Sequence, residues 1–340
     1  MTVTRLGAGK KRKHYAAVLV SAFCLFGASL VSAQEQAEPL ALPILQDIND
    51  AAKNLDYSGV IVYSQGSNSQ AMRLIHVIDG TGERERLEIL DGSPREFLRQ
   101  NDVTQCLVPD QELIIIERRS SERFPAFFSG PTQEVEQYYR LQQTGRTDRV
   151  AGRDCDVLEL QPKDEWRYGY RLCADKHNKL LLRLETIGAQ QHIIDQVTFA
   201  SVNFGEQVNL QDLHSPWKAS NWKVVEPELI DVNLLEMGWH IAMPPGFKGI
   251  SEVRRSMRAG RQATHMVIGD GLSAISVFLE AVRDLDEEVA NIEGAYHRGA
   301  MNMFRLRKGD YLLTTTGEVP MATLRSLAEK TEFVPQLRAH

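Results

Sequence analysis

The chain has 340 residues, and its 45 acidic side chains outnumber its 39 basic ones, which gives a net charge of −6. A net negative chain has no general affinity for nucleic acids or anionic membranes, so the composition excludes binding to either through overall charge. The length is typical of two domains.

The N-terminus predicts a secretory signal peptide that is removed after Ala33. Residues 10–13 (KKRK) are basic, residues 15–31 are apolar, and Val31-Ser32-Ala33 has the small and apolar residues of a cleavage site. The alternative is a membrane anchor, because the apolar run approaches the length of a spanning helix. Five of the 39 Lys and Arg residues and no acid lie in residues 1–33, so the exported chain would have 34 basic and 45 acidic side chains, a net charge of −11.

The first part of the exported chain predicts one helix followed by many strands. The apolar residues of "PILQDINDAAKNL" lie on one helical face, and short β-rich segments separated by Gly, Asp, Asn and Pro follow. This regular spacing favours an antiparallel meander over a parallel α/β sheet. We expect a second helix at 132–143 and strands at 58–64, 71–78, 84–90, 95–100, 103–108, 112–117, 146–150, 155–161, 166–174, 180–187 and 192–203.

A break follows near residues 210–236, where Pro216, Pro227 and two tryptophans interrupt any regular pattern. Beyond it we expect a smaller α+β unit that ends in a helix at 321–329, with Pro320 at a position that favours a helix start. Its expected strands lie near 251–257, 263–268, 273–280, 303–307 and 311–316. The fold class predicted is α+β, mostly antiparallel β.

The sequence shows no set of residues typical of catalysis. "GDGLSA" at 269–274 fits a dinucleotide-binding pattern, but it lies between two strand-like segments and is better interpreted as a hairpin turn. The histidines are scattered and the cysteine spacing is unlike a zinc site, so we predict no catalytic residue, metal or cofactor. A secreted hydrolase is the least favoured class of function.

Two segments are candidates for binding. Phe124, Phe127 and Phe128 lie in "RFPAFFSGP", which predicts either an apolar lid over a cavity or ordinary packing under a loop. The segment "EVRRSMRAGR" is locally basic, which indicates either a solvated strand edge or a docking site for carboxylates or phosphates. Its candidate contact residues are Arg254, Arg255, Arg258 and Arg261.

Several segments together resemble the RseB/MucB family of periplasmic sigma-E regulators. They are "YSGVIVYSQG" (57–66), "LEILDGSPREFLR" (87–99), "VAGRDCDVLELQPKDEWRYGYRLCAD" (150–175), "MPPGF" (243–247) and "GDYLLTTTGEVP" (309–320), and the resemblance extends from about residue 44 to 334. It implies a LolA/LppX-like incomplete β-barrel with helices at 34–212, a linker at 213–236 and a smaller C-terminal domain at 237–334. One departure is Cys173, where relatives are expected to have a bulky aromatic residue.

The resemblance also implies a function. A protein of this family binds the periplasmic part of an inner-membrane anti-sigma factor and protects it from proteolysis, and lipopolysaccharide or a related lipid releases it. For this chain we expect a soluble periplasmic protein of a Gram-negative bacterium, a lipid-sensing first domain, a second domain that contacts the partner, and a possible homodimer. The alternative is a periplasmic carrier of lipids or lipoproteins.

The stretch "GRDCDVLELQPKDEWRYGYRLCADK" (152–176) combines acids, aromatics and two cysteines. We interpret it as a hairpin with a short loop at 163–165, which makes one face apolar and the other polar. In this register Leu158 is opposite Tyr170, Leu160 opposite Tyr168 and Cys155 opposite Cys173, while Glu159 is diagonal to Arg171 and Arg167. A Cys155–Cys173 disulfide then leaves Cys106 as a thiol, although a two-residue slip would keep the faces and separate the two cysteines.

Overall fold

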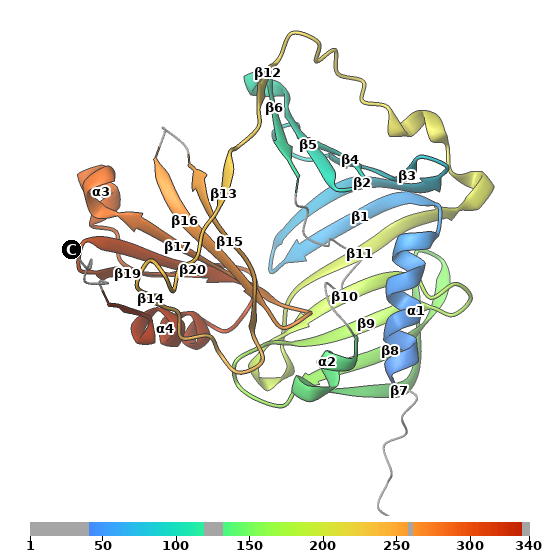
Figure 1. The fold of residues 1–340 in the computed structure, drawn as a ribbon. Coiled ribbons are helices and arrows are strands. Elements are labelled where there is room, and N and C mark those ends of the chain that lie inside the picture. The colour runs from blue at the N-terminus through green and yellow to red at the C-terminus, as the bar shows by residue number, and fades with distance from the viewer. Residues whose placement is uncertain (1–40, 119–131, 258–260, 335–340) are drawn as a thin grey trace, which may run out of the picture. The chain divides into compact units, whose positions relative to one another are not determined.

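The computed structural model describes residues 41–118, 132–257 and 261–334, which belong to one compact unit. The predicted signal peptide, the three candidate phenylalanines and Arg258 lie outside these ranges. Most of the described chain is antiparallel β-sheet, as predicted, in one large sheet and one smaller sheet (Figure 1). No described helix is long and apolar enough to cross a membrane.

The large sheet has twelve strands in the order β12-β6-β5-β4-β3-β2-β1-β11-β10-β9-β8-β7. It is thus two meanders joined by the β1–β11 pair, and it is open, with β12 and β7 at its edges. Each of the eleven strands expected from the sequence has a counterpart. The bounds are β1 Tyr57–Gln65, β2 Asn68–Asp79, β3 Gly82–Ile89, β4 Glu96–Gln100, β5 Val103–Val108, β6 Leu113–Glu117, β7 Tyr139–Val150, β8 Arg153–Pro162, β9 Gly169–Asp175, β10 Leu181–Ile187, β11 Ile193–Phe204 and β12 Lys223–Val225.

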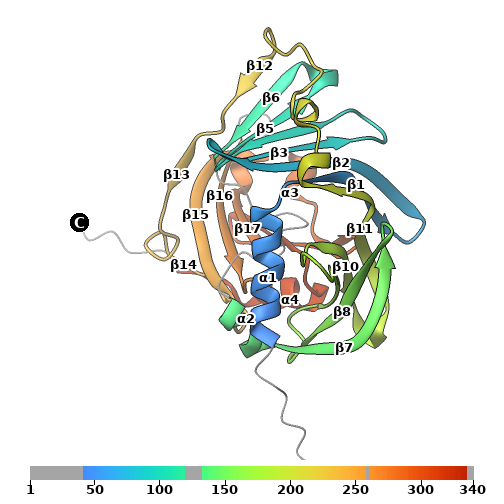
Figure 2. The same cartoon turned by 90° about the vertical axis from the view of Figure 1, so that its right-hand side faces the viewer.

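Two helices accompany this sheet, and Figure 2 shows the sheet bending around the first. Helix α1 (Ala41–Asn54) buries Leu45 and Ile48 completely, in a core that also contains Leu158 and Leu172. Helix α2 (Thr132–Tyr138) is shorter than predicted. It ends at Tyr138 because the following residues form β7, which pairs with β8 along the sheet edge.

The hairpin β8–β9 differs from its predicted register by two residues. Leu158 is opposite Leu172 and Leu160 is opposite Tyr170, while Cys155 is opposite Asp175. The two-residue slip keeps the apolar and polar faces, as expected. The prediction that it would separate the cysteines is wrong, because Cys155 and Cys173 are diagonal neighbours with Cα atoms 5.3 Å apart and form a disulfide.

The smaller sheet has seven antiparallel strands in the order β13-β15-β16-β17-β20-β19-β18, and a two-stranded sheet pairs β14 with β21. The turn between β16 and β17 is the hairpin predicted from "GDGLSA". Helix α4 covers one face, where its Leu324 and Leu327 share a core with Ile275, Val277 and Leu313. The bounds are β13 Leu229–Asp231, β14 Trp239–His240, β15 Lys248–Ser256, β16 Gln262–Gly269, β17 Ala274–Ala281, α3 Glu287–Ala290, β18 Gly294–Arg298, β19 Met301–Lys308, β20 Tyr311–Gly317, α4 Met321–Lys330 and β21 Glu332–Phe333.

The segment expected as a linker contributes a strand to each sheet. Strand β12 pairs in parallel with β6, and β13 pairs antiparallel with β15. Both strands have three residues, and such short edge strands limit unwanted pairing with other chains. The sequence did not predict strands β12, β13 and β18, because they are three to five residues long and mostly exposed, so they show no hydrophobic period.

Candidate binding sites

The most enclosed polar cluster surrounds Arg167, in the loop between β8 and β9. Its Nε donates to Asp164, its Nη1 donates to Asp270 at 2.7 Å, and its Nη2 donates to the carbonyl oxygen of Pro245. The side chains of Arg167 and Asp270 are both fully buried. This ion pair therefore joins the β8–β9 loop to the β16–β17 turn of the smaller sheet.

Aromatic rings and backbone donors complete the cluster. The guanidinium group of Arg167 lies over Tyr138 and Phe247, with 4.6 Å and 5.1 Å to the ring centres. Tyr139 donates its hydroxyl to Asp270, whose other oxygen accepts the backbone N–H groups of the turn. Burial raises the pKa of Tyr139, so this hydroxyl stays a donor at neutral pH. Because each charge is paired and hydrogen-bonded, the cluster is built to position the two sheets.

Further contacts extend this joint between the sheets. Tyr170 hydrogen-bonds Ser273 at 2.8 Å, Asn302 donates to the Tyr168 hydroxyl at 2.9 Å, and Thr323 donates to the carbonyl oxygen of Trp166. The stretch 152–176, with its acids, aromatic residues and cysteines, is thus the hairpin that contacts the smaller sheet and holds it in place. Arg167 was predicted as a residue of a strand's polar face, and it lies instead in a longer loop with its charge buried.

A cavity of about 860 Å³ is the candidate ligand site. Its walls come from β5 and β6, from the linker strand β12 and from the end of β15. Apolar side chains form much of it, and three basic groups and one acidic group accompany them. The residues that line it include Cys106, Val108, Leu113, Ile115, Val225, Pro227 and Met257, with Arg95, Lys223, Arg255 and Glu117.

Arg255 is one of the three cationic groups of this cavity, and none of the three forms an ion pair with the described residues. His265 stacks on Phe278 with 4.2 Å between ring centres, and burial together with the charge of Arg255 lowers the pKa of His265 to about 4. Three cationic groups with one carboxylate beside apolar walls favour a ligand with an anionic group.

The candidate arginines do not form one patch. Alternation along β15 directs Arg254 and Arg255 to opposite faces, and only Arg255 lines the cavity. Arg261 pairs with Glu280 at 3.3 Å. The sequence pattern did not identify Arg95 and Lys223, which come from distant segments and have no local signal. The thiol of Cys106 lines the same cavity and is not part of the disulfide.

The described ranges contain no group of three or more His, Cys, Asp and Glu residues that could hold a metal ion. His76 is buried and bonded through Nδ1 to the carbonyl oxygen of Leu55 and through Nε2 to Glu83. Its ring also stacks on Tyr57. The two hydrogen bonds and the stacking contact are sufficient to explain a structural role for His76.

A large open sheet, an apolar cavity with basic groups and a polar joint to a smaller sheet define a binding protein with two β-sheet domains. Residues 41–217 match the model of the MucB/RseB N-terminal domain, and residues 234–332 match that of the MucB/RseB C-terminal domain. The chain therefore belongs to the MucB/RseB family.

Relatives of known role and structure span nearly the same length. The sigma factor AlgU regulatory protein MucB of Pseudomonas aeruginosa is 26% identical over 287 residues, which cover 84% of this chain and 88% of the relative. The sigma-E factor regulatory protein RseB of Haemophilus influenzae is 23% identical over 311 residues, or 90% and 94% of the two chains. The solved MucA/MucB complex of P. aeruginosa contains a chain with the same fold, at a TM-score of 0.68 and 24% identity, covering 87% of this chain and 99% of that one.

Proposed function

We propose that this protein is a periplasmic negative regulator of an envelope-stress sigma factor. It binds the periplasmic region of an inner-membrane anti-sigma factor and protects that region from the first proteolytic cut. A lipopolysaccharide or related lipid signal then releases it. The observation that carries this proposal is the match of both family domains, in order, over most of the described chain.

The similar proteins support the partner. The curated relatives are named as regulatory proteins of sigma factors, and one solved structure with this fold is described as MucB in complex with MucA(peri). The direct test is a pull-down of tagged, exported protein from periplasm and inner membrane. We expect an inner-membrane anti-sigma factor to co-purify, and added lipopolysaccharide to release it. Light scattering of the purified protein would measure whether it forms a homodimer.

The two halves divide the work in this proposal. Residues 34–212, which contribute every strand of the large sheet except β12, sense acyl chains, and residues 237–334 carry most of the anti-sigma contact. If a chain that lacks residues 237–340 kept the full affinity for the anti-sigma factor, this division would be wrong. The proposed export is checked by cell fractionation, where a chain without residues 1–33 should stay in the cytoplasm.

A lipid or lipoprotein carrier is the second candidate, and the cavity of about 860 Å³ favours it. Cavities of this size with apolar walls accept acyl chains, and Arg95, Lys223 and Arg255 would suit an anionic head group. A carrier binds lipid tightly without any anti-sigma partner and does not co-purify with one. The substitution Ile115→Glu, which places a charge in the apolar wall, should weaken lipid binding in either case.

A further inference from the structure

A second surface with features of a binding site lies on β18 and β19, away from the residues that line the cavity. Strand β18 is an edge strand of the smaller sheet and pairs with β19 on one side. Within the described ranges no strand pairs with its other side. Its backbone groups on that side can therefore pair with an added strand.

Apolar side chains gather next to this edge. The register places Tyr296 opposite Met303 and Arg298 opposite Met301, so all four side chains project from the same face. That face is opposite to α4, whose core includes Phe304. Tyr296 and Met301 are each 44% exposed and Met303 is 36% exposed. Exposed methionines and tyrosine adapt to varied apolar partners.

The same face is cationic. Arg298, Arg305 and Arg307 project from it and form no ion pair with the described residues, although the whole chain is net negative. A carboxylate supplied by a partner would pair with these guanidinium groups.

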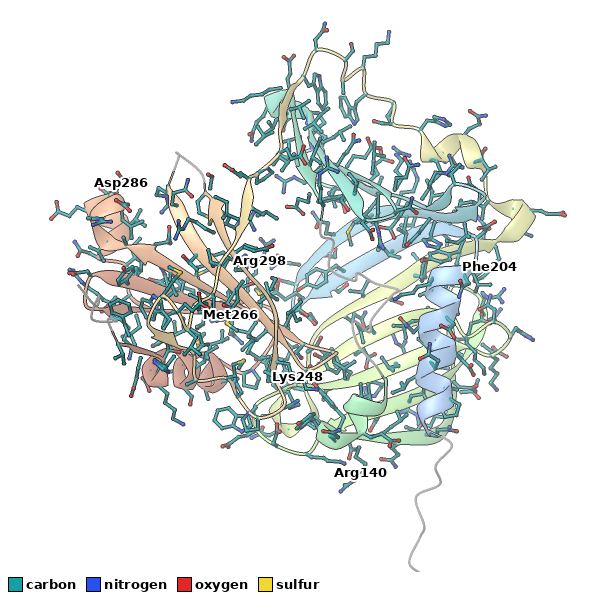
Figure 3. All side chains as sticks on the ribbon, in the orientation of Figure 1. Arg140, Phe204, Lys248, Met266, Asp286 and Arg298 are labelled. Atoms are coloured by element: carbon teal, nitrogen blue, oxygen red, sulfur yellow. A yellow bond between two sulfur atoms is a disulfide. The ribbon has the colours of Figure 1, made fainter. Side chains whose placement is uncertain are left out.

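The hairpin is held in place before any partner arrives. At its turn, the backbone N–H of Ala300 donates to Asp195 at 3.1 Å, and Tyr63 donates to the same carboxylate oxygen at 3.0 Å. Asn302 donates to the carbonyl oxygen of Val319 at 2.8 Å. A surface fixed in this way loses little conformational entropy on binding. Figure 3 labels Arg298, at the end of β18.

We propose that the free edge of β18 and the adjoining face of β19 bind an acidic, partly apolar peptide segment, which adds to the sheet as an extended strand. Backbone hydrogen bonds to β18 supply affinity. Every second side chain of the added strand projects over this face. These side chains are in turn apolar, toward the methionines, and acidic, toward the arginines. This inference rests on the proposed function in one respect, since the periplasmic region of the anti-sigma factor is the partner that would supply the segment.

The test uses the full exported chain and two probes. One is an acetylated eight-residue peptide in which Val and Glu take turns at every second position and Ser fills the positions between them, so that both kinds of side chain reach the same face. The other is the anti-sigma periplasmic region. The variants are Arg298→Glu and Met303→Glu, alone and combined. The matched control is Arg140→Glu, an exposed arginine on β7, an edge strand of the large sheet. We expect the combined variant to weaken binding of both probes at least tenfold, and the control to change it less than twofold.

A second measurement reports strand addition directly. On binding, the backbone amides on the outer side of β18 should become protected from hydrogen exchange. If the peptide binds the wild type and the combined variant equally, or does not bind the wild type, the inference is wrong. If the peptide binds as expected but the anti-sigma region does not bind at all, the proposed function fails while the peptide site stands.

Discussion

At the scale of single residues, a fully buried ion pair joins the two sheets. The Arg167–Asp270 pair is fully buried. Arg167 also donates to Asp164 and to the carbonyl oxygen of Pro245, and Asp270 accepts the backbone N–H of Leu272. Such pairs add little net stability over apolar residues, but they are costly to break because one charge is left unpaired.

The first prediction concerns this pair. Arg167→Met leaves the Asp270 carboxylate buried without its cation, and we expect the free energy of unfolding to fall by about 3–5 kcal/mol. Asp270→Asn keeps the acceptor for the turn's backbone N–H groups but removes the charge. The double variant should lose less than the sum of the singles, by about 1–3 kcal/mol in a urea-unfolding cycle. Simple additivity would show that the two charges are not coupled.

The second prediction concerns His265 and pH. Its pKa is about 4 in the folded chain, because of burial and Arg255, and about 6.5 when exposed. Between these values the unfolded chain binds the proton and the folded chain does not. Stability is therefore complete above pH 6.5 and decreases as the pH falls toward 4, by at most about 3 kcal/mol from this residue.

His265→Gln should remove that part of the pH dependence while leaving the steeper loss below pH 4. There the ion-paired carboxylates take up protons, since Arg183 and Arg153 hold the pKa values of Asp148 and Asp175 below the usual range. Urea unfolding of wild type and variant at pH 7.5, 6, 5 and 4 checks this. Parallel curves across that range would contradict the assigned role of His265.

At the scale of elements, the hairpin β8–β9 combines a disulfide with the loop that reaches the smaller sheet. Cys155 and Cys173 are buried, and their sequence separation is 18, with that loop between them. Replacing both by Ser should lower the free energy of unfolding by about 2–4 kcal/mol, mainly through the unfolded chain. Non-reducing peptide mapping together with thermal unfolding measures both points. A disulfide that involves Cys106 in the mapping would contradict the pairing.

This hairpin also shows what the sequence can and cannot predict. Alternation predicted both strands and their two faces, but its period of two makes registers two residues apart indistinguishable. The loop length decides between them, and the loop is longer because Arg167 binds Asp270, which lies 103 residues away in the chain. The sequence named Arg255 as a candidate contact residue but not Arg95 or Lys223, since these two join it in the cavity only after folding. Local pattern carries no information about such long-range partners.

At the scale of the whole molecule, two sheets with separate hydrophobic cores are joined by polar contacts and by a linker that extends both. Ile275, Val277 and Leu313 belong to one core, and Leu158 and Leu172 belong to another. Leu272 of the β16–β17 turn packs against the core of the large sheet, and the buried hydrogen bonds of the joint add to this contact between the sheets.

Cooperative unfolding should therefore depend on the joint. In calorimetry of a chain of residues 34–340, the variant with Arg167→Met and Asp270→Asn should unfold with the transitions of its two sheets further apart than in wild type, since each sheet then melts nearer its own midpoint. The control is Arg171→Met, which removes a partly exposed arginine of the same hairpin that pairs with Glu159 and Glu185 within the large sheet. This control should change the transition temperature of the large sheet and leave that of the smaller sheet unchanged. An unchanged separation in the joint variant would mean that the linker strands, rather than the buried ion pair, couple the two sheets.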